Sequence, residues 1–191
     1  MRLLQNPLSL RAVAGIVAML VLVGCQRPEV PLPENAEVDA RASAATAAPV
    51  TAAGLEAAPA VVAYTAWKSC NMEQLDGHPF TGVPLSVKAG SDFVVAGFVL
   101  NEERQEIPTD IKLRVLSDGN VNAWEVGMRG RVNRPDIPQY FKLGAWAAGA
   151  GIEQLVSSTG LPPGTYHLVF TFSDGDRKLI CDNGRQLTIL P

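Results

Sequence analysis

The chain has 191 residues, of which 18% are charged, and its formal net charge is -3 at pH 7. This weakly acidic balance excludes a general nucleic-acid-binding protein, which would carry an excess of Lys and Arg. The three cysteines are too few for a four-cysteine zinc site. A chain of this length allows one domain of ordinary size together with additional segments.

The first 25 residues have the organisation of an export signal. Arg2 and Arg11 give a positive start, and the apolar run at 12–23 is too short to span a bilayer comfortably. The run ends in Leu22-Val23-Gly24-Cys25, which resembles the bacterial lipobox, in which small residues precede an invariant cysteine. The alternatives are an uncleaved anchor and an ordinary secretory signal with a chance cysteine.

The resemblance to bacterial lipoproteins implies how the chain is processed. Residues 1–24 would be the signal peptide, and Cys25 would receive a diacylglycerol on its thiol and a fatty acid on its amine. Several acyl chains make such anchoring stable. Gln26 follows in place of an aspartate, a pattern that resembles lipoproteins sorted to the outer membrane. We therefore expect an envelope protein attached to the membrane by its N-terminal lipid, on the periplasmic face or the cell surface.

Residues 26–60 differ in composition from the rest of the chain. They include no aromatic residue, and 12 of these 35 residues are Ala and five are Pro. Such a segment cannot bury enough apolar surface to offset its chain entropy. We expect a disordered tether over 25–60, with a short alanine-rich helix within 40–58 as the alternative. All twelve aromatic residues (three Trp, three Tyr and six Phe) lie in 61–191, which we predict to be the folded domain.

The predicted domain has the pattern of short strands separated by turns. The run at 92–100 is nearly all apolar, as in a buried central strand. Residues 111–115 alternate between apolar and basic, which indicates a strand with one buried and one wet face. Further strands are predicted at 121–132, 151–157, 165–172, 177–181 and 186–190. Turns are predicted at 117–120, 173–176 and 182–184, and one helical turn near 136–140.

About seven short strands predict an all-β fold, an antiparallel β-sandwich. The run Leu-Pro-Pro-Gly-Thr-Tyr at 161–166 resembles the tyrosine corner of immunoglobulin-like domains, in which a tyrosine hydroxyl bonds to backbone a few residues upstream. The segment 94–190 also resembles small immunoglobulin-like modules of bacterial envelope proteins, through Ala-Gly-Phe at 96–98 and Arg-Pro-Asp-Ile at 134–137. The resemblance implies an immunoglobulin-like sandwich and no particular activity.

Two cysteines, Cys70 and Cys181, remain after lipidation of Cys25. Two cysteines in an exported domain most often form a disulfide, so we expect a bond that joins the start of the domain to its final strands. The alternative is a pair of reactive thiols or metal ligands. A metal would need further ligands, and the only histidines are His78 and His167. We predict no metal and no cofactor.

Common catalytic signatures are missing from the sequence. It has no Gly-x-Ser-x-Gly elbow, no phosphate-cradling loop that ends in Gly-Lys-Ser or Gly-Lys-Thr, and no His-Glu-x-x-His. The adjacent acids Glu102 and Glu103 lie in a polar segment, where we expect them to be solvated. A glycosidase would need two carboxyls held apart across a cleft. We therefore expect that the chain is not an enzyme.

Basic residues form the first candidate binding group. Arg129, Arg131 and Arg134 occur with no acid between 126 and 135, and the first two have the spacing of residues on one face of a strand. Lys112 and Arg114 form a similar pair on the predicted wet face. These residues would fit an anionic glycan or an acidic protein surface. The alternative is an ordinary solvated sheet face.

Aromatic residues are the second feature for binding: Trp67, Trp124, Tyr140, Phe141 and Trp146. Tyr140, Phe141 and Trp146 form the candidate group, because they lie in an irregular region between predicted strands. They would bind a sugar ring or a protein if exposed, and the alternative is that they belong to the core. We therefore expect a lipid-anchored, non-catalytic binding or structural module of the envelope, with a protein as partner. The alternatives are a protective inhibitor of a wall hydrolase or a phage protein, and a module that binds anionic glycans.

Overall fold

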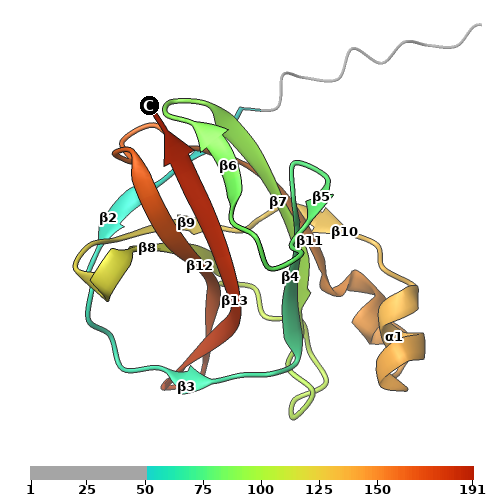
Figure 1. Ribbon diagram of the computed structural model, residues 1–191. Helices are drawn as coiled ribbons and strands as arrows, with labels where there is room; N and C mark the ends of the chain where they lie inside the picture. The colour runs from blue at the N-terminus through green and yellow to red at the C-terminus, as the bar shows by residue number, and fades with distance from the viewer. Residues whose placement is uncertain (1–50) are drawn as a thin grey trace, which may run out of the picture. The chain divides into compact units, whose positions relative to one another are not determined.

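The computed structural model describes residues 51–191 (Figure 1). The expected signal peptide, Cys25 and the tether up to residue 50 lie outside the described residues. The strands are β1 (Ala53–Gly54), β2 (Glu56–Ala58), β3 (Thr65–Ala66), β4 (Cys70–Leu75), β5 (His78–Pro79), β6 (Leu85–Lys88), β7 (Asp92–Val99), β8 (Lys112–Ser117), β9 (Ala123–Gly127), β10 (Arg131–Val132), β11 (Gly151–Ser157), β12 (Gly164–Asp174) and β13 (Arg177–Leu190). The helical elements are η1 (Asp118–Asn120), α1 (Asp136–Phe141) and η2 (Ala145–Ala150).

Two sheets make up the domain, which confirms the predicted all-β fold. Sheet A has the strand order β1-β11-β7-β4-β5, with β10 on β11, and sheet B has the order β2-β9-β8-β12-β13-β3, with β6 on β13. Strands of five or more residues are β4, β7 and β11 in sheet A and β8, β9, β12 and β13 in sheet B. Their pairings are antiparallel, whereas the short strands β1, β3 and β6 pair in parallel. This arrangement is compatible with the predicted sandwich.

One hydrophobic core lies between the two sheets. Because side chains alternate along a strand, each sheet turns every second residue inward. Phe93 and Ile152 come from sheet A, Leu113 and Phe170 come from sheet B, and none of the four is more than 1% exposed. The two inner faces therefore stabilise each other by burying a shared apolar surface.

The predicted tyrosine corner is present at the start of β12. The hydroxyl of Tyr166 donates to the carbonyl oxygen of Pro162 at 2.6 Å. Its ring packs edge-on against Trp124, with centroids 5.7 Å apart. The hydrogen bond satisfies the hydroxyl of a tyrosine that is 4% exposed, so the ring can be buried without loss of a polar partner.

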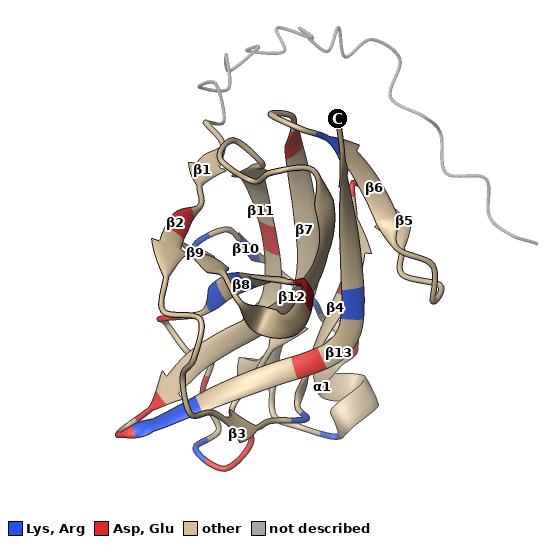
Figure 2. Ribbon diagram, turned by 60° about the vertical axis from the view of Figure 1, so that its left-hand side comes forward, with Lys and Arg blue, Asp and Glu red and all other residues tan. Residues whose placement is uncertain are grey.

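Strand pairing begins at Ala53, whereas the sequence placed the start of the domain at 61. Residue 53 pairs with β11 in sheet A, and β2 then pairs with β9 at one edge of sheet B. The chain next crosses the outer face of sheet B and reaches β3, at the opposite edge (Figures 1 and 2). We call residues 56–66 the strap. Its small side chains Ala58 and Ala60 pack against apolar residues of that face.

The predicted turn at 182–184 is instead a bulge inside β13. Leu168 pairs with Arg185 and Phe170 pairs with Cys181, so two steps along β12 (170 − 168) match four along β13 (185 − 181). Gly184 has a φ of 66°, a conformation that favours glycine. The sequence signal for positive φ was correct, but the chain uses it to bend one 14-residue strand rather than to end it.

A helical insertion, residues 136–150, connects β10 to β11 at one end of sheet A (Figure 1). The predicted helical turn is therefore present as α1. Ile137, Ala147 and Ala150 of the insertion are buried against Phe98 and Leu100 at the end of β7. This second cluster holds the insertion rigidly on the sandwich.

Candidate functional site

The predicted basic strand face does not form. β9 ends at Gly127 and β10 begins at Arg131, because the chain leaves sheet B and enters sheet A between them. The side-chain oxygen of Gln154 accepts from the backbone N–H groups of Arg129 and Gly130, each at 3.0 Å, and fixes this crossing. Arg129 therefore lies within the crossing between the sheets, whereas Arg131 begins β10, so the two do not share one strand.

Arg131 and Arg134 are engaged within the domain. Nη2 of Arg131 donates to the carbonyl oxygen of Pro108 at 3.0 Å, and burial lowers the pKa of its guanidinium. Arg134 bonds Asp136 at 2.7 Å and Glu73 at 2.5 Å, and these bonds raise the pKa of its guanidinium. The charge of Arg134 is thus compensated by acids of the domain, so its attraction for an anionic ligand is weaker.

Arg114 is not on a wet face, as the alternation had predicted, but is 1% exposed beneath the strap. Its guanidinium donates to Glu125 at 2.5 Å and to the carbonyl oxygens of Pro59 and Ala60. The ring of Tyr64 lies 5.6 Å from the guanidinium carbon. These contacts surround the buried charge with partners, as a buried cation requires.

Two grooves run beside the strap on the outer face of sheet B, with volumes of about 560 and 220 Å³. Pro59, Lys112 and Glu125 border both of them. Lys112 pairs with Glu125 at 2.9 Å, and the same carboxylate pairs with the buried Arg114. Figure 2 shows basic and acidic residues interspersed over the strands. This face is of mixed charge and does not form the predicted basic surface.

Tyr140 is the exposed member of the predicted aromatic group. Its side chain is 81% exposed, while Phe141 and Trp146 are half-buried against the cluster beneath the insertion. The Phe141 ring packs edge-on against Phe98, with centroids 5.6 Å apart, and Tyr140 lies 5.0 Å from Phe141. The structure thus brings two of the three aromatics into contact and presents one of them to solvent.

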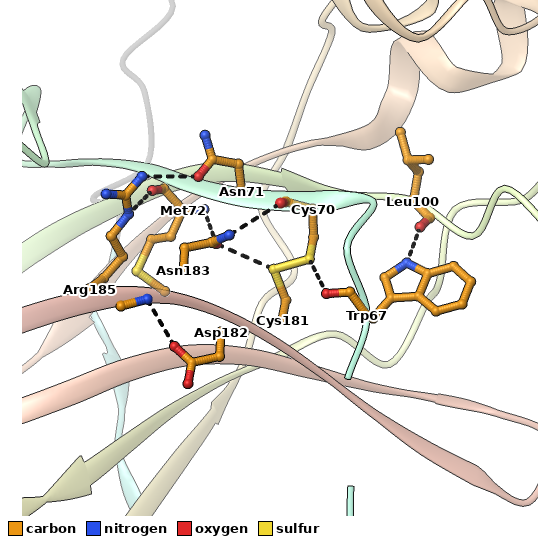
Figure 3. Close-up of a disulfide and its surroundings, with 10 residues drawn as sticks. Trp67, Cys70, Asn71, Met72, Leu100, Cys181, Asp182, Asn183 and Arg185 are labelled. Atoms are coloured by element: carbon orange, nitrogen blue, oxygen red, sulfur yellow. Dashed lines mark hydrogen bonds between the residues drawn. A yellow bond between two sulfur atoms is a disulfide. The ribbon is translucent and has the colours of Figure 1, made fainter. Parts of the chain in front are cut away.

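The predicted disulfide joins Cys70 of β4 to Cys181 of β13 (Figure 3). The bulge of β13 adds polar contacts beside it: Asn183 accepts from the N–H of Met72 at 3.0 Å, and Nε of Arg185 donates to the carbonyl oxygen of Met72 at 2.9 Å. These side chains satisfy backbone groups on the edge of β4 away from β7, in the part that the short strand β5 does not pair with. The edge is therefore closed against pairing with another strand.

A pocket of about 410 Å³ lies at the end of the domain that carries the insertion. It is lined by Ala66, Trp67, Lys68, Ser69, Glu102 and Glu103, and we call it the Trp67 pocket. Sequence reasoning missed it, because Trp67 and the two acids are far apart in the chain. They meet because Leu100, at the end of β7, bonds to Ser69 before β4. No local sequence signal announces that contact.

Ion pairs fix the loop that carries these acids. Asp174, whose side chain is 1% exposed, contacts both Arg104 and Arg177, and Arg177 also pairs with Glu103 at 2.9 Å. The hydrogen bond from Arg177 and the nearby charge of Arg104 lower the pKa of Asp174. The connection between β7 and β8 is therefore tied to the hairpin between β12 and β13.

Within residues 51–191, no group of three or more His, Cys, Asp or Glu side chains is placed to hold a metal ion. No helix in that part of the chain is long and apolar enough to cross a membrane. No protein-family model matches the chain, and a search of curated proteins also finds no match.

Proposed function

We propose that the chain is a lipid-anchored, non-catalytic module of the bacterial cell envelope that binds a protein partner through its helical insertion. The lipobox resemblance at 22–25 supports the anchor. The two-sheet domain, closed by a disulfide, supports a rigid scaffold for presenting a binding surface.

Tyr140 is the observation that carries the proposal. Its ring is 81% exposed, yet α1 beneath it is held by the buried side chain of Ile137. A tyrosine on a rigidly packed helix loses little conformational entropy on binding, and it offers both apolar area and a hydroxyl group. Such residues are enriched among the few side chains that dominate protein–protein affinity.

The position of the insertion also favours this role. Ala53 pairs with Val156 near one end of β11, whereas the insertion leads directly into Gly151 at the other end. The chain that comes from the proposed anchor thus enters the fold at the end opposite the insertion (Figure 1). The insertion and residue 53 therefore lie at opposite ends of β11.

The alternative functions have weaker support. An anionic glycan needs available cations, but Arg134 and Lys112 already pair with acids of this domain. A protective inhibitor would use the same exposed surface as a structural module, so the identity of the partner separates these two.

Photo-crosslinking in living cells tests the proposal. A photoreactive residue at position 140 should yield one dominant protein adduct, identified by mass spectrometry. The matched control is position 121, where Val121 is 71% exposed in the connection between β8 and β9 of sheet B. Equal adducts at both positions, or none at 140, would contradict a specific protein surface on the insertion.

Labelling with a fatty acid tests the anchor separately. The label should enter the wild-type protein and should not enter a Cys25→Ala variant. Incorporation into that variant, or no incorporation into the wild type, would show that Cys25 is not the site of lipidation.

A further inference from the structure

We propose that the Trp67 pocket binds a cationic side chain, an arginine or a lysine, of the protein partner. This inference rests on the proposed protein-binding function, and it assigns to that partner a basic residue at a defined place. It uses Trp67 and Glu102, which lie outside the basic group and outside the irregular segment that carries Tyr140, Phe141 and Trp146.

The indole of Trp67 is held in one orientation. Its Nε1–H donates to the carbonyl oxygen of Leu100 at 2.8 Å (Figure 3), and its ring meets the Phe172 ring edge-on, with centroids 6.0 Å apart. The side chain is half-buried and borders the pocket. A tryptophan ring presents a negative face that attracts a guanidinium or an ammonium group.

The two carboxylates of the pocket differ in their partners. Glu103 already pairs with Arg177 at 2.9 Å. Glu102 is half-buried, and its carboxylate has no hydrogen bond or ion pair with any described residue. Lys68 also lines the pocket, and within the described residues it forms no ion pair with Glu102 or Glu103. A partly desolvated carboxylate without a partner gains most from an incoming cation.

The loop around Glu102 is ordered before any ligand arrives. Asn101 and Glu106 exchange backbone hydrogen bonds of 2.9 and 3.1 Å, and the side chain of Asn101 accepts from the N–H of Arg104 at 3.2 Å. Arg104 also contacts the buried carboxylate of Asp174. The loop therefore needs little further ordering when a side chain enters the pocket, and this favours binding.

Leu100 connects the pocket to the insertion. Its carbonyl oxygen accepts from Trp67, while its side chain is fully buried in the cluster beneath α1. The two surfaces therefore share one structural support at one end of the domain. A single partner that covers Tyr140 can also place a basic residue against Trp67.

Nuclear magnetic resonance of the acylated full chain in detergent micelles tests the pocket directly. The probe is the blocked tripeptide Gly-Arg-Gly, and blocked Gly-Glu-Gly is the charge control. The indole N–H of Trp67 should shift saturably with the arginine peptide only, while Trp124 and Trp146 serve as internal references. Glu102→Gln should weaken the arginine response about tenfold, as expected for loss of a hydrogen bond to a charged group.

Glu106→Gln is the matched variant, because Glu106 is exposed in the same loop and does not line the pocket. It should leave the arginine response unchanged. Equal shifts with both peptides, no shift at Trp67, or an unchanged response in Glu102→Gln would overturn the inference. A shift with neutral oligosaccharides in place of the arginine peptide would also overturn it and assign the pocket to sugars.

The two proposals fail in different ways. A protein adduct at position 140 with no response of Trp67 would support the protein-binding function and contradict the proposal that the pocket binds a cation. A response of Trp67 without any adduct at position 140 would support the pocket's preference for cations and contradict the proposed protein partner.

Discussion

Arg114 and Glu125 face each other across β8 and β9, with Nη1 of the arginine 2.5 Å from Oε1 of the glutamate. The strap closes over the pair and gives two carbonyl oxygens to the same guanidinium. Sheet B therefore has a charged contact on the face that would otherwise meet solvent. The buried cation thus adds a contact between the strap and the sheet to the strand pairings of β2 and β3.

Loss of that cation should destabilise the domain strongly. We expect Arg114→Ala to lower the free energy of unfolding by about 3 kcal/mol or more, because two strap carbonyls lose their donor and Glu125 loses the buried one of its two cations. Lys112→Ala is the control, since Lys112 pairs with the same glutamate from an exposed position, and it should cost less than about 1 kcal/mol. Urea unfolding of both variants measures the difference. Similar losses of stability would contradict a special role for the buried Arg114 in joining the strap to sheet B.

Glu125 should make stability depend on acidity. Burial raises the pKa of its carboxyl, but hydrogen bonds from Lys112 and Arg114 outweigh this, and the pKa is lowered from the usual 4.5. A carboxyl with a lowered pKa stabilises the fold above 4.5, and the stabilisation is lost as the pH falls through its folded value. Unfolding measured at descending pH should show this loss. The acid-dependent slope should be smaller in Glu125→Gln, and an unchanged slope would assign it to other carboxyls.

The disulfide should contribute through the unfolded state. It closes a separation of 111 residues, for which loop entropy predicts a stabilisation of about 4–5 kcal/mol. A Cys70→Ala/Cys181→Ala double variant should lose stability on that scale while keeping its strand content, since Asn183 and Arg185 still join β13 to β4. Denaturant unfolding and circular dichroism test both statements. Two reactive thiols in the exported, unreduced protein would contradict the bond.

Two strand glycines should differ in their response to an added methyl group. A Cβ on Gly97 would lie 2.2 Å from the carbonyl oxygen of Asn71 and 3.0 Å from Cα of Met72, and backbone cannot yield as a flexible side chain does. Gly97→Ala should therefore cost about 1–3 kcal/mol. Gly127→Ala places its Cβ in open space and should change stability by no more than about 0.5 kcal/mol. Thermal unfolding of the pair provides the comparison, and equal effects would argue against a close approach at Gly97.

The sequence predicted β11 and the start of α1 well because these segments contain their own pattern. β11 begins and ends where expected, at Gly151 and Ser157, and α1 begins at the predicted Asp136. The tyrosine corner was also local, since Tyr166 and Pro162 are four residues apart. Each of these features depends on neighbours in the chain, which periodicity and turn residues report.

The errors came from contacts distant in sequence. Alternation around Arg114 predicted a wet face because nothing in β8 shows that residues 59 and 60 cover it. The strap looked like tether because its alanines lack an apolar stripe, although small side chains are what a close crossing over a sheet requires. The Trp67 pocket likewise depends on the start of β4 lying beside the end of β7.

The strap also determines which fragments of this protein keep the outer face of sheet B covered. A fragment that starts at residue 61, where the aromatic-rich sequence begins, would lack Ala58 and Ala60 and uncover the apolar side chains of Leu116 and Val169. Their exposure on the outer face of a sheet favours association between copies. A fragment that starts at residue 51 retains the cover. We expect the shorter fragment to associate because the strap is missing, and such association would say nothing about the oligomeric state of the whole protein.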